Sequence, residues 1–544
     1  MKIYRLHVLM CGGTQCVSAG GESFESVLKD ELKKHNLTDE VQIVRSGCMG
    51  ACDRGPLMLV YPEGILYQRL KPSDAKEIVA EHFLKGRKVK RLMWTEDGHP
   101  YPTMNEVPFF ARQTKIVLRN CGLINAESID EYIAADGYAA LGKAITEMKP
   151  ADVVAEVKAS GVRGRGGAGF PTGLKWELGA KSTGDTKYII CNADEGDPGA
   201  YMDRSVLEGD PHSVLEGMAI AAYAIGAKQG YIYVRAEYPL AIKRLEQAIK
   251  QARAYGLLGN NILGTTFCFD VKMRMGAGAF VCGEETALIN SIEGKRGEPH
   301  LKPPYPVTSG LWGKPTVINN VETLASIPVI IHKGQEFFRK IGTKASPGTK
   351  VFSLAGKVNT TGLIEVPLGM PLREIIFDIG GGIPAGKKFK GALTGGPSGG
   401  VIPMEHLDTP VDYESLNALG SIMGSGGLIV MDETSCMVDI AKFFLEFTVD
   451  ESCGKCTPCR EGTMQMYRLL KKITEGKGEE GDIEKLEAMG KAIKSTALCG
   501  LGQSAPNPVL STIRFFRHEY EAHIKDKKCP SGVCKMKEEA AVKA

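Results

Sequence analysis

The chain has 544 residues, which is long enough for several domains and a large buried core. Lysine and arginine total 67 against 64 acidic residues, and a net charge of +3 without an arginine-rich arm argues against nucleic-acid binding. No apolar run reaches the roughly 18 residues that cross a bilayer, and the first residues lack the pattern of a signal peptide. We therefore expect a cytoplasmic protein with no membrane segment.

Residues 1–90 predict the element order of a thioredoxin-like domain. The patterns indicate a strand at 3–10, a helix at 23–35, a strand at 41–45, two short strands and a final helix at 73–84. The next segment, 91–114, is first basic and then rich in proline and histidine, so it predicts a linker.

The remaining chain predicts an α/β multidomain protein. Helix and strand patterns alternate over 115–345, which indicates an α/β core. Residues 346–432 are rich in strand patterns and glycine and predict a small β domain, and 433–526 predict an antiparallel helical bundle. Residues 527–544 form a tail that carries a pair of cysteines.

Fifteen cysteines occur mostly in spaced groups, which in a long chain of this kind favours metal ligation over disulfides. The first group is Cys11, Cys16, Cys48 and Cys52, in two glycine-containing loops that each follow a strand. Four thiolates suit a [2Fe-2S] cluster or zinc, and the gaps of four and three residues are less typical of zinc ribbons. The spacing favours [2Fe-2S], with zinc and free thiols as the alternatives.

The second group is Cys453, Cys456 and Cys459, with Cys499 far downstream. Three closely spaced cysteines can ligate three irons of a cubane cluster, and a cysteine distant in the sequence can ligate the fourth. This spacing predicts a [4Fe-4S] cluster.

The third group is the tail pair Cys529 and Cys534, preceded by His518 and His523. These four residues predict a tetrahedral zinc site, against the alternative of two free thiols in a tail. The five remaining cysteines occur singly in apolar surroundings and are interpreted as small buried hydrophobic residues: Cys121, Cys191, Cys268, Cys282 and Cys436.

The stretch GVRGRGGAGFPTGLKW (161–176) contains the dinucleotide pattern G-x-G-x-x-G. A Rossmann turn needs a strand before the glycines and a helix opening at the third, whereas here a helical pattern ends at Gly161 and Pro171 follows the glycines. The Rossmann interpretation therefore fails. The arginines, Phe170 and Lys175 instead predict a loop that wraps a phosphate-bearing ligand with a flat ring, and a ligand-free glycine loop is the alternative.

Two further stretches support a ligand. CNADEGDPG (191–199) follows a strand, where ligands of α/β sheets collect. FVCGEETALINSIEG (280–294) places Gly283, Glu284 and Glu285 just before a helix, whose first N–H groups attract electron-rich groups.

With these motifs, and with LKPPYP, VINNVETL, ESCGKCTPCREG and TALCGLGQSAPNP, the chain resembles the NADH-oxidising flavoprotein subunit of respiratory complex I and its relatives in soluble hydrogenases and formate dehydrogenases. The resemblance covers about 115–520. It implies a Rossmann-like FMN domain, a ubiquitin-like β-grasp domain and a helical [4Fe-4S] bundle.

The resemblance also implies roles for individual residues. The residues implied to hold FMN are Gly164, Arg165, Gly166, Gly167, Lys175, Asn192, Asp194, Glu195, Gly283, Glu284, Asn319 and Asn320. Those implied to receive NADH are Phe170, Glu285, Lys302 and Tyr305, and Glu284 and Glu285 are candidates for tuning the flavin. Three positions in the same region depart from the complex I pattern: Phe280 replaces a Tyr, Asp197 a Glu and Leu178 an aromatic residue.

The amino-terminal domain resembles the thioredoxin-like ferredoxin that is a separate subunit in complex I, and its fusion here is similar to the β subunit of multimeric iron hydrogenases, including electron-bifurcating ones. We therefore predict an NAD(H)-linked flavin and iron-sulfur subunit of a soluble redox complex. Its expected partners are other iron-sulfur subunits of hydrogenase or formate dehydrogenase type, a small [2Fe-2S] subunit and ferredoxin. The alternatives are a flavin-free electron relay and a stand-alone NADH:acceptor reductase.

Overall fold

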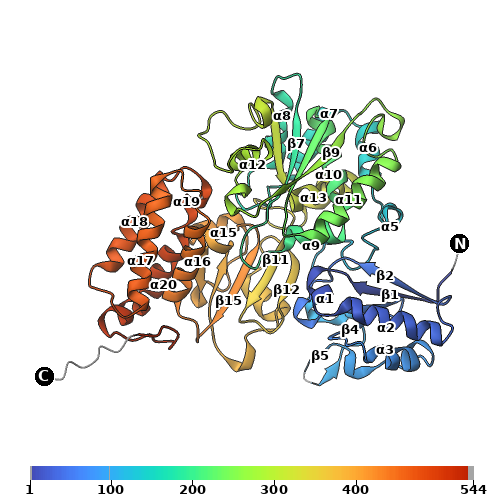
Figure 1. Cartoon of the computed structure of the whole chain (residues 1–544), viewed down its shortest axis with the longest axis horizontal. Helices are drawn as coiled ribbons and strands as arrows, with labels where there is room; N and C mark the ends of the chain where they lie inside the picture. Colours follow the sequence, from blue (N-terminus) through green and yellow to red (C-terminus); the bar gives the residue numbers. More distant parts are fainter. Residues whose placement is uncertain (1–2, 97, 537–544) are drawn as a thin grey trace.

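Four groups of secondary structure follow one another along the chain (Figure 1). The structure is a computed structural model that describes residues 3–96 and 98–536. The second and third groups form the centre of the molecule, with the amino-terminal group packed beneath them and the carboxyl-terminal helices at the opposite end.

The amino-terminal group is a four-stranded sheet with helices, and it confirms the predicted thioredoxin-like order. The strands lie in the order β2-β1-β3-β4, with β1 and β2 parallel and the other pairs antiparallel. Side chains of β1 alternate between two cores: Leu6, Val8 and Met10 enter one, and Leu9 and Cys11 enter the other, because successive strand residues point to opposite faces. The elements are β1 (Leu6–Cys11), α1 (Thr14–Ser18), α2 (Gly21–Lys34), β2 (Val41–Ser46), β3 (Met58–Tyr61), β4 (Ile65–Tyr67) and α3 (Asp74–Glu77), continued by a π-helical turn over Ile78–Phe83.

The segment predicted as a linker packs against the domains that it joins. Trp94, Phe109 and Phe110 are buried and contact one another with ring centroids 5.1 to 6.1 Å apart. They share an apolar core with Phe352 and Ile364 of the third group. Burial of three aromatic rings holds the amino-terminal group in place on the rest of the chain. The segment contains β5 (Thr95–Glu96), β6 (His99–Pro100) and α4 (Pro108–Ala111).

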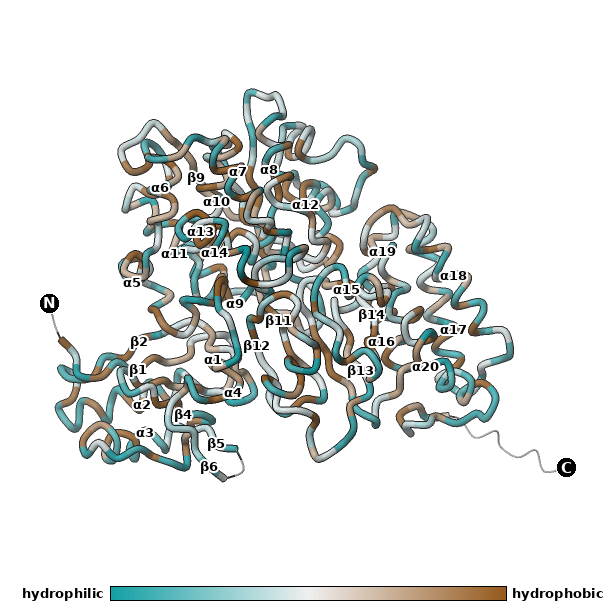
Figure 2. Tube along the Cα trace, turned by 180° about the vertical axis from the view of Figure 1, so that it is seen from behind, coloured by the Kyte–Doolittle hydropathy of each residue, from teal (hydrophilic) through white to brown (hydrophobic). Residues whose placement is uncertain are grey.

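The second group is a parallel four-stranded sheet in the order β10-β7-β8-β9, with helices on both faces. Ile189 and Cys191 of β7 enter the core on the side of α10 and α13, and Ile190 enters the core on the side of α12. Figure 2 shows the apolar character of α10 and α13, which pack against each other. The strands are β7 (Tyr188–Ala193), β8 (Gln229–Arg235), β9 (Asp270–Gly276) and β10 (Thr316–Asn320). The helices are α5 (Ile129–Ala134), α6 (Ala139–Glu147), α7 (Pro150–Ser160), α8 (Thr172–Lys181), α9 (Met202–Gly209), α10 (Pro211–Ile225), α11 (Pro239–Ala254), α12 (Glu285–Ile292), α13 (Val321–Lys333) and α14 (Gln335–Arg339).

The third group is a five-stranded mixed sheet in the order β12-β11-β15-β13-β14. Its first strand, β11, pairs in parallel with its last, β15, and the other pairs are antiparallel. This arrangement is the one expected of a ubiquitin-like β-grasp domain. The elements are β11 (Thr349–Gly356), β12 (Gly362–Pro367), β13 (Phe389–Thr394), β14 (Gly400–Pro403), α15 (Tyr413–Ala418) and β15 (Gly427–Asp432).

The fourth group is helical, as predicted, and its core contains Leu445, Leu470, Leu486 and Ile513 from four different helices. The helices are α16 (Met437–Asp450), α17 (Met464–Thr474), α18 (Asp482–Thr496), α19 (Gly500–Ser504) and α20 (Asn507–Lys525). Across the part of the chain that the structure describes, no helix is long and apolar enough to cross a membrane.

Candidate functional site

The strand order of the parallel sheet reverses between β7 and β10, and we call the region outside the carboxyl ends of these two strands the crevice. The chain moves from β7 through β8 to β9 in one direction and then crosses to the other side of β7 to form β10. Ligands of open α/β sheets bind outside the carboxyl ends of the two strands at such a reversal. Asn192 is the last residue but one of β7, Asp194 and Glu195 directly follow the strand, and Asn319 and Asn320 end β10. Five of the predicted FMN residues therefore meet at one crevice.

The glycine loop lies between α7 and α8, beside this crevice. Helix α7 ends at Ser160, with Gly161 at φ 70°, where the sequence predicted the end of a helix. Helix α8 begins at Thr172, directly after Pro171. A Cβ on Gly166 would lie 3.1 Å from Cβ of Asn320, so the loop backbone lies close to the end of β10. Gly167 has φ 123°, which favours glycine.

Arg165 is placed differently from its predicted role. Its guanidinium donates hydrogen bonds to the carbonyls of Arg163, Pro347 and Thr349, and the residue is 1% exposed. Its side chain is thus a structural support under the loop, and its backbone N–H is also occupied, because it donates to the Thr323 hydroxyl at 2.8 Å.

Lys175 and Trp176 of α8 contact β10. Lys175 Nζ donates to the Ile318 carbonyl at 3.1 Å, and Trp176 Nε1 donates to Asn319 Oδ1 at 2.8 Å. Trp176 is fully buried and orients the Asn319 amide at the crevice. This contact was not predicted, because the two residues are 143 positions apart.

The carboxylate oxygens of Asp194 accept no hydrogen bond from the protein. Both of its carboxylate oxygens are buried and have no hydrogen-bond partner, and the nearest cation, Arg235, lies 3.8 Å away. Burial raises the pKa of this carboxyl to about 7 although Arg235 opposes the shift. An unpaired buried carboxylate is costly, and the hydroxyl and ring N–H donors of FMN are groups that would satisfy it. The residues at the crevice therefore fit FMN.

Glu195 and Asp203 are buried beneath the crevice. Glu195 accepts the backbone N–H groups of Asp203 and Arg204, both at 3.1 Å, and burial raises its pKa to about 7. Asp203 accepts a hydrogen bond from Asn320 Nδ2 at 2.6 Å, and burial raises its pKa as well. Nearby, Asp197 accepts a hydrogen bond from Ser425, and burial raises its pKa to about 6.

The loop before α12 carries the predicted nucleotide-binding acids. Glu284 caps α12 by accepting the N–H groups of Thr286 and Ala287 at 2.8 and 3.0 Å. Burial opposes its ionisation, but hydrogen bonds from Lys302 and Thr286 outweigh burial and hold its pKa below the usual value. Lys302 also pairs with Glu285 at 2.6 Å. Gly283 is adjacent, where its carbonyl accepts Asn192 Nδ2 at 2.9 Å.

The aromatic residues predicted to meet NADH differ in exposure. Phe170 is 44% exposed and Tyr305 is 55% exposed, so each side chain presents part of its ring to a ligand. Phe280 instead packs edge-on against Phe447 of α16, with centroids 5.3 Å apart, and its N–H donates to Glu451 at 2.8 Å. Phe280 thus joins the nucleotide loop to the helical group.

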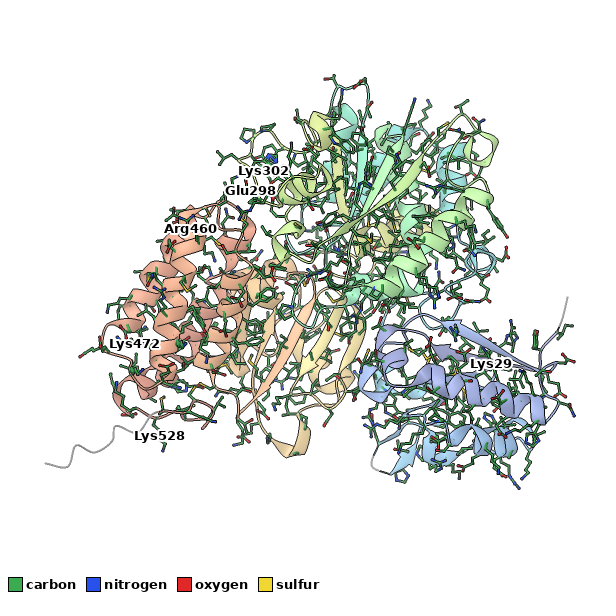
Figure 3. All side chains as sticks on the ribbon, viewed as in Figure 1. Lys29, Glu298, Lys302, Arg460, Lys472 and Lys528 are labelled. Atoms are coloured by element: carbon green, nitrogen blue, oxygen red, sulfur yellow. The ribbon has the colours of Figure 1, made fainter. Side chains whose placement is uncertain are left out.

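The second cysteine group converges as predicted. Cys453, Cys456, Cys459 and Cys499 line one small enclosed cavity, together with Val281 and Pro299 of the second group. Arg296 donates to the Cys453 carbonyl at 2.8 Å, and Lys455 pairs with Glu298 at 3.3 Å. Figure 3 shows Glu298 and Lys302 on the loops that face Arg460 of the helical group. Four thiols around one cavity fit a [4Fe-4S] cluster.

The first cysteine group also converges. Cys11, Cys16, Cys48 and Cys52 line a single cavity between their two loops. A Cβ on Gly13 would lie 3.0 Å from Cys48 Cβ, and one on Gly55 would lie 2.9 Å from Cys16 Sγ. Glycines at these positions allow the two loops to approach, and the four thiols fit a [2Fe-2S] cluster.

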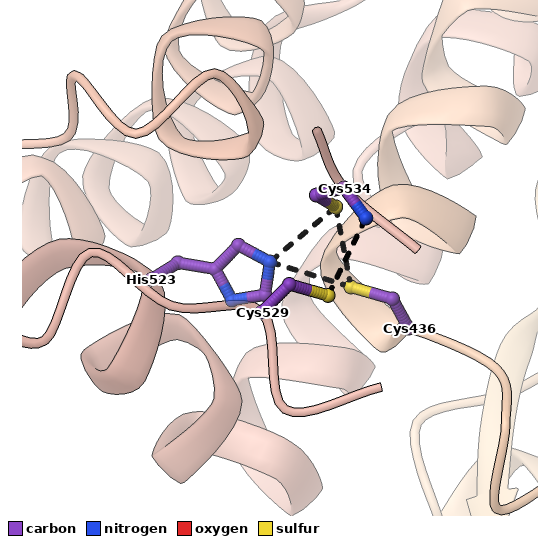
Figure 4. Close-up of side chains that lie close together, drawn as sticks. All are labelled: Cys436, His523, Cys529 and Cys534. Atoms are coloured by element: carbon purple, nitrogen blue, oxygen red, sulfur yellow. Dashed lines mark hydrogen bonds between the residues drawn. The ribbon is translucent and has the colours of Figure 1, made fainter. Parts of the chain in front are cut away.

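The third group differs from the prediction in one member. Cys436, His523, Cys529 and Cys534 lie together, with all four ligand atoms within 4.8 Å of one another (Figure 4). His523 Nδ1 contacts the Glu519 carbonyl at 2.7 Å, and its Nε2 lies 3.4 Å from Cys534 Sγ and 3.5 Å from Cys436 Sγ.

The observed group leaves out His518, where the prediction was wrong, and adds Cys436, which is buried as predicted. His518 is five residues before His523 on α20, and at 3.6 residues per turn the two side chains leave the helix in different directions. Cys436, interpreted as a buried hydrophobic residue, takes that place at the start of α16. The sequence carried no signal for it, because 87 residues separate Cys436 from His523.

The chain matches three family descriptions: thioredoxin-like [2Fe-2S] ferredoxin over residues 2–82, Nuo51 FMN-binding domain over 157–329, and NADH-ubiquinone oxidoreductase-F iron-sulfur binding region over 439–523. It is 63% identical over 423 residues to the NADP-reducing hydrogenase subunit HndC of Solidesulfovibrio fructosivorans, which covers 78% of this chain and 86% of that protein. The chain belongs to the Nuo51 flavoprotein family.

Two further relatives match this chain over most of its length. One of the NADH-quinone oxidoreductase subunits of Rhizobium meliloti (strain 1021) is 48% identical over 415 residues, covering 76% of this chain and 99% of the relative. The structure of an NAD+-reducing [NiFe]-hydrogenase in the H2-reduced state matches with a TM-score of 0.66 and 30% identity, over 96% of this chain and 84% of that one. As a Nuo51 family member with a fused ferredoxin domain, the chain carries FMN, [4Fe-4S] and [2Fe-2S] domains, which confirms these three predicted cofactors.

Proposed function

We propose that the chain oxidises NADH, or reduces NAD+, in the crevice at the ends of β7 and β10 and exchanges the electrons one at a time with iron-sulfur clusters. The observation that carries the proposal is the cavity of the second cysteine group. Val281, in the loop that also carries Gly283 and Glu284, lines the same cavity as Cys453, Cys456, Cys459 and Cys499. The nucleotide loop and the cluster ligands are therefore in direct contact.

The chemistry requires a group that handles both one and two electrons. Nicotinamide releases two electrons as a hydride, and an iron-sulfur cluster accepts one. Bound FMN supplies this conversion. The chain's own residues position the reactants: Asn192, Asp194 and the glycine loop hold the flavin, and Phe170 offers a ring face to the adenine of NADH.

The acids before α12 set the electrostatics of nucleotide binding. Glu284 and Glu285 share Lys302, and Lys175 also pairs with Glu285 at 3.9 Å, so two cations balance the two carboxylates. The cations keep the two carboxylates from repelling the dinucleotide phosphates, and Glu285 remains available to ribose hydroxyls. Burial raises the pKa of both Glu195 and Asp203, which disfavours a second pair of charged carboxylates next to the crevice.

Anaerobic purification followed by cofactor extraction tests this function. The expected result is one FMN per chain, with its absorption band bleached by NADH under anaerobic conditions. A protein without FMN that still carries both clusters would instead support the flavin-free electron relay.

We further propose that the chain is a subunit of a larger redox assembly located in the cytoplasm, with hydrogenase-type or other iron-sulfur subunits as partners. The HndC relative is named as a hydrogenase subunit and the Rhizobium meliloti relative as a quinone oxidoreductase subunit, which supports a subunit role. The native mass of the complex from its source tests this. A single chain with full physiological turnover would favour the stand-alone reductase.

The third cysteine group supports a revised metal proposal. We propose that Cys436, His523, Cys529 and Cys534 bind zinc in place of the set predicted with His518. Three thiols and one imidazole are a common tetrahedral zinc set, and the Nδ1 contact with Glu519 leaves Nε2 to face the thiols. Such a site would tie the tail to α16 and α20.

A further inference from the structure

A cavity of about 330 Å³ lies between the amino-terminal group and the second group, and we call it the interdomain cavity. One wall comes from the segment 10–18, and the opposite wall comes from α9 and α11. Its volume is in the range of small-molecule sites. Among the described residues, it shares only Cys11 with the cavity of the first cysteine group, so the two cavities are distinct.

Three cations of the second group line the interdomain cavity: Arg204 of α9, and Lys243 and Arg244 of α11. Arg244 is 3% exposed, and its Nε and Nη1 have no hydrogen-bond partner among the described residues. Arg204 Nε is also buried without a partner, and its guanidinium lies over the rings of Tyr201 and Tyr238 at 5.4 and 5.5 Å. Lys243 is exposed. Buried N–H groups without acceptors are costly, and an acceptor ligand would remove that cost.

The carboxylates around the interdomain cavity already have cations. Four of them line it, and each is paired with an arginine at 2.8 to 3.9 Å: Glu22, Glu25, Glu127 and Glu237. Glu127 lies 3.4 Å from Arg244 Nη2, which leaves Nε and Nη1 of Arg244 unused. Glu208 lies 3.7 Å from Arg204 Nε, too far for a hydrogen bond, and accepts the N–H of Thr14 instead. The unused hydrogen-bonding capacity is therefore in donors, which favours an anionic ligand.

We propose that the interdomain cavity binds a small molecule with a phosphate group through Arg204, Lys243 and Arg244. Phosphate oxygens match the planar set of donors that a guanidinium presents, and an ammonium adds a point charge. Apolar contacts for the organic part of the ligand come from three other residues that line the cavity: Val17, Pro239 and Leu240. Such a ligand would contact both groups and hold them together.

The proposed phosphate site lies between the flavin crevice and the first cysteine group. The Arg204 N–H donates to the Glu195 carboxylate at 3.1 Å. On the opposite wall, Arg244 Nη2 would lie 3.7 Å from a Cβ on Gly12, the neighbour of Cys11. Reduction of a [2Fe-2S] cluster adds a negative charge beside the bound anion, so phosphate disfavours reduction, and by linkage the reduced protein binds phosphate less tightly. This coupling rests on the proposed function, because it takes Cys11 as a cluster ligand.

Isothermal titration calorimetry of the NADH-free holoprotein with inorganic phosphate and with phenyl phosphate tests the site. We expect one site per chain that binds phenyl phosphate more tightly, and Arg244→Gln should weaken both ligands about tenfold. Arg253→Gln is the matched control, because Arg253 of the same helix pairs with Asp270 at 2.9 Å and is not among the residues that line the cavity. No binding to the parent protein, or equal binding to the parent and Arg244→Gln, would overturn the inference. Equal affinity for the two ligands would overturn its organic part and leave free phosphate as the ligand.

A second pair of variants decides the question if Arg244→Gln does not fold. Lys243→Glu changes an exposed residue and should weaken phosphate binding about fivefold. Lys250→Glu is its control, because Lys250 is also exposed on α11 but is not among the residues that line the cavity. Equal effects of the two variants would show that only the overall charge matters and would overturn the site.

A redox titration followed by the EPR signal of the reduced [2Fe-2S] cluster tests the coupling. The potential of the parent protein should be more negative in saturating phosphate than in chloride at equal ionic strength. An affinity of the reduced protein that is about threefold lower corresponds to a shift of about 28 mV. Arg244→Gln should show the same potential in both salts. Phosphate binding with an unchanged potential would overturn the coupling, whereas phosphate binding to a parent protein without a [2Fe-2S] signal would contradict the proposed cluster ligands and support the phosphate site.

Discussion

Lys302 Nζ lies between two carboxylates, 2.8 Å from Glu284 and 2.6 Å from Glu285. Glu284 and Glu285 stand at the start of α12 and Lys302 in the loop after this helix, so the fold places the Lys302 cation between two carboxylates. The arrangement explains why adjacent glutamates at the start of α12 are compatible with binding a dinucleotide that is itself negatively charged.

Lys302→Met should raise the KM for NADH about tenfold, equivalent to ~1.4 kcal/mol of binding free energy. Without the cation, Glu284 and Glu285 repel the phosphates of NADH. The FMN content should stay at the parent level. Steady-state kinetics with an artificial acceptor measures the change, and Lys295→Met is the control, because Lys295 pairs with Glu293 in an exposed position. An unchanged KM would remove Lys302 from the nucleotide site.

Phe170→Ala should weaken NADH binding and leave FMN bound. The Phe170 ring is 44% exposed, and the cation nearest its centroid is Lys175 at 5.8 Å. Loss of stacking on adenine should cost about 0.5–1.5 kcal/mol, or roughly 2- to 12-fold in affinity. Phe337→Ala is a matched control, since Phe337 is also part-exposed (38%) with Lys333 at 5.0 Å. Loss of NADH binding and FMN together would contradict the separation of roles.

Asp194→Asn should lower the FMN content and stabilise the FMN-free chain in a pH-dependent manner. Burial raises the pKa of Asp194 from 3.8 to about 7, so the folded state binds the proton more tightly than the unfolded state. Ionisation of Asp194 therefore does not lower the free energy of unfolding below pH 3.8. It lowers this free energy progressively as the pH rises, and the loss is complete above about pH 7. The melting temperature of the FMN-free variant should exceed that of the parent by a margin that grows over this range. A margin that is constant with pH would show that Asp194 is already neutralised by a partner.

Cys499→Ser should remove the EPR signal of the [4Fe-4S] cluster and leave that of the [2Fe-2S] cluster. Cys499 is the ligand distant in the sequence, and the three nearby cysteines can hold only three corners of a cubane. Iron and sulfide analysis should show a loss of about four irons per chain. Cys268→Ser is the control, because Cys268 lies on a loop before β9, away from the cysteine groups. Retention of the full iron content in Cys499→Ser would exclude it as a ligand.

Cys436→Ser should remove bound zinc, whereas His518→Ala should retain it. The variants distinguish the observed group from the predicted one, which differ only in these two residues. Elemental analysis after removal of loosely bound metal measures zinc per chain, and limited proteolysis between 526 and 536 reports whether the tail is still held. Stoichiometric zinc in Cys436→Ser, or its loss in His518→Ala, would restore the first assignment.

Local patterns determined much of this protein. The cysteine spacings at 11–52 and 453–459 predicted two clusters, because ligands that are close in the sequence must be presented by one or two loops whatever the surrounding fold. The end of α7 next to Gly161 was also predicted from the sequence. Glycine permits a positive φ and proline fixes φ at about −65° at the position where each occurs, without help from distant residues.

Only the tertiary structure decided which residues work together across long separations. In the structure, the Arg165 side chain binds backbone carbonyls away from the crevice, and Trp176 donates a hydrogen bond to Asn319. Cys436 takes the place predicted for His518 in the third cysteine group. The tertiary structure also placed α9 on the amino-terminal cysteine loops, where Glu208 accepts a hydrogen bond from the Thr14 N–H. The physical reason is that a side chain's partners depend on helix rotation and domain packing, which arise from the summed burial of many residues and leave no mark on the spacing of any two.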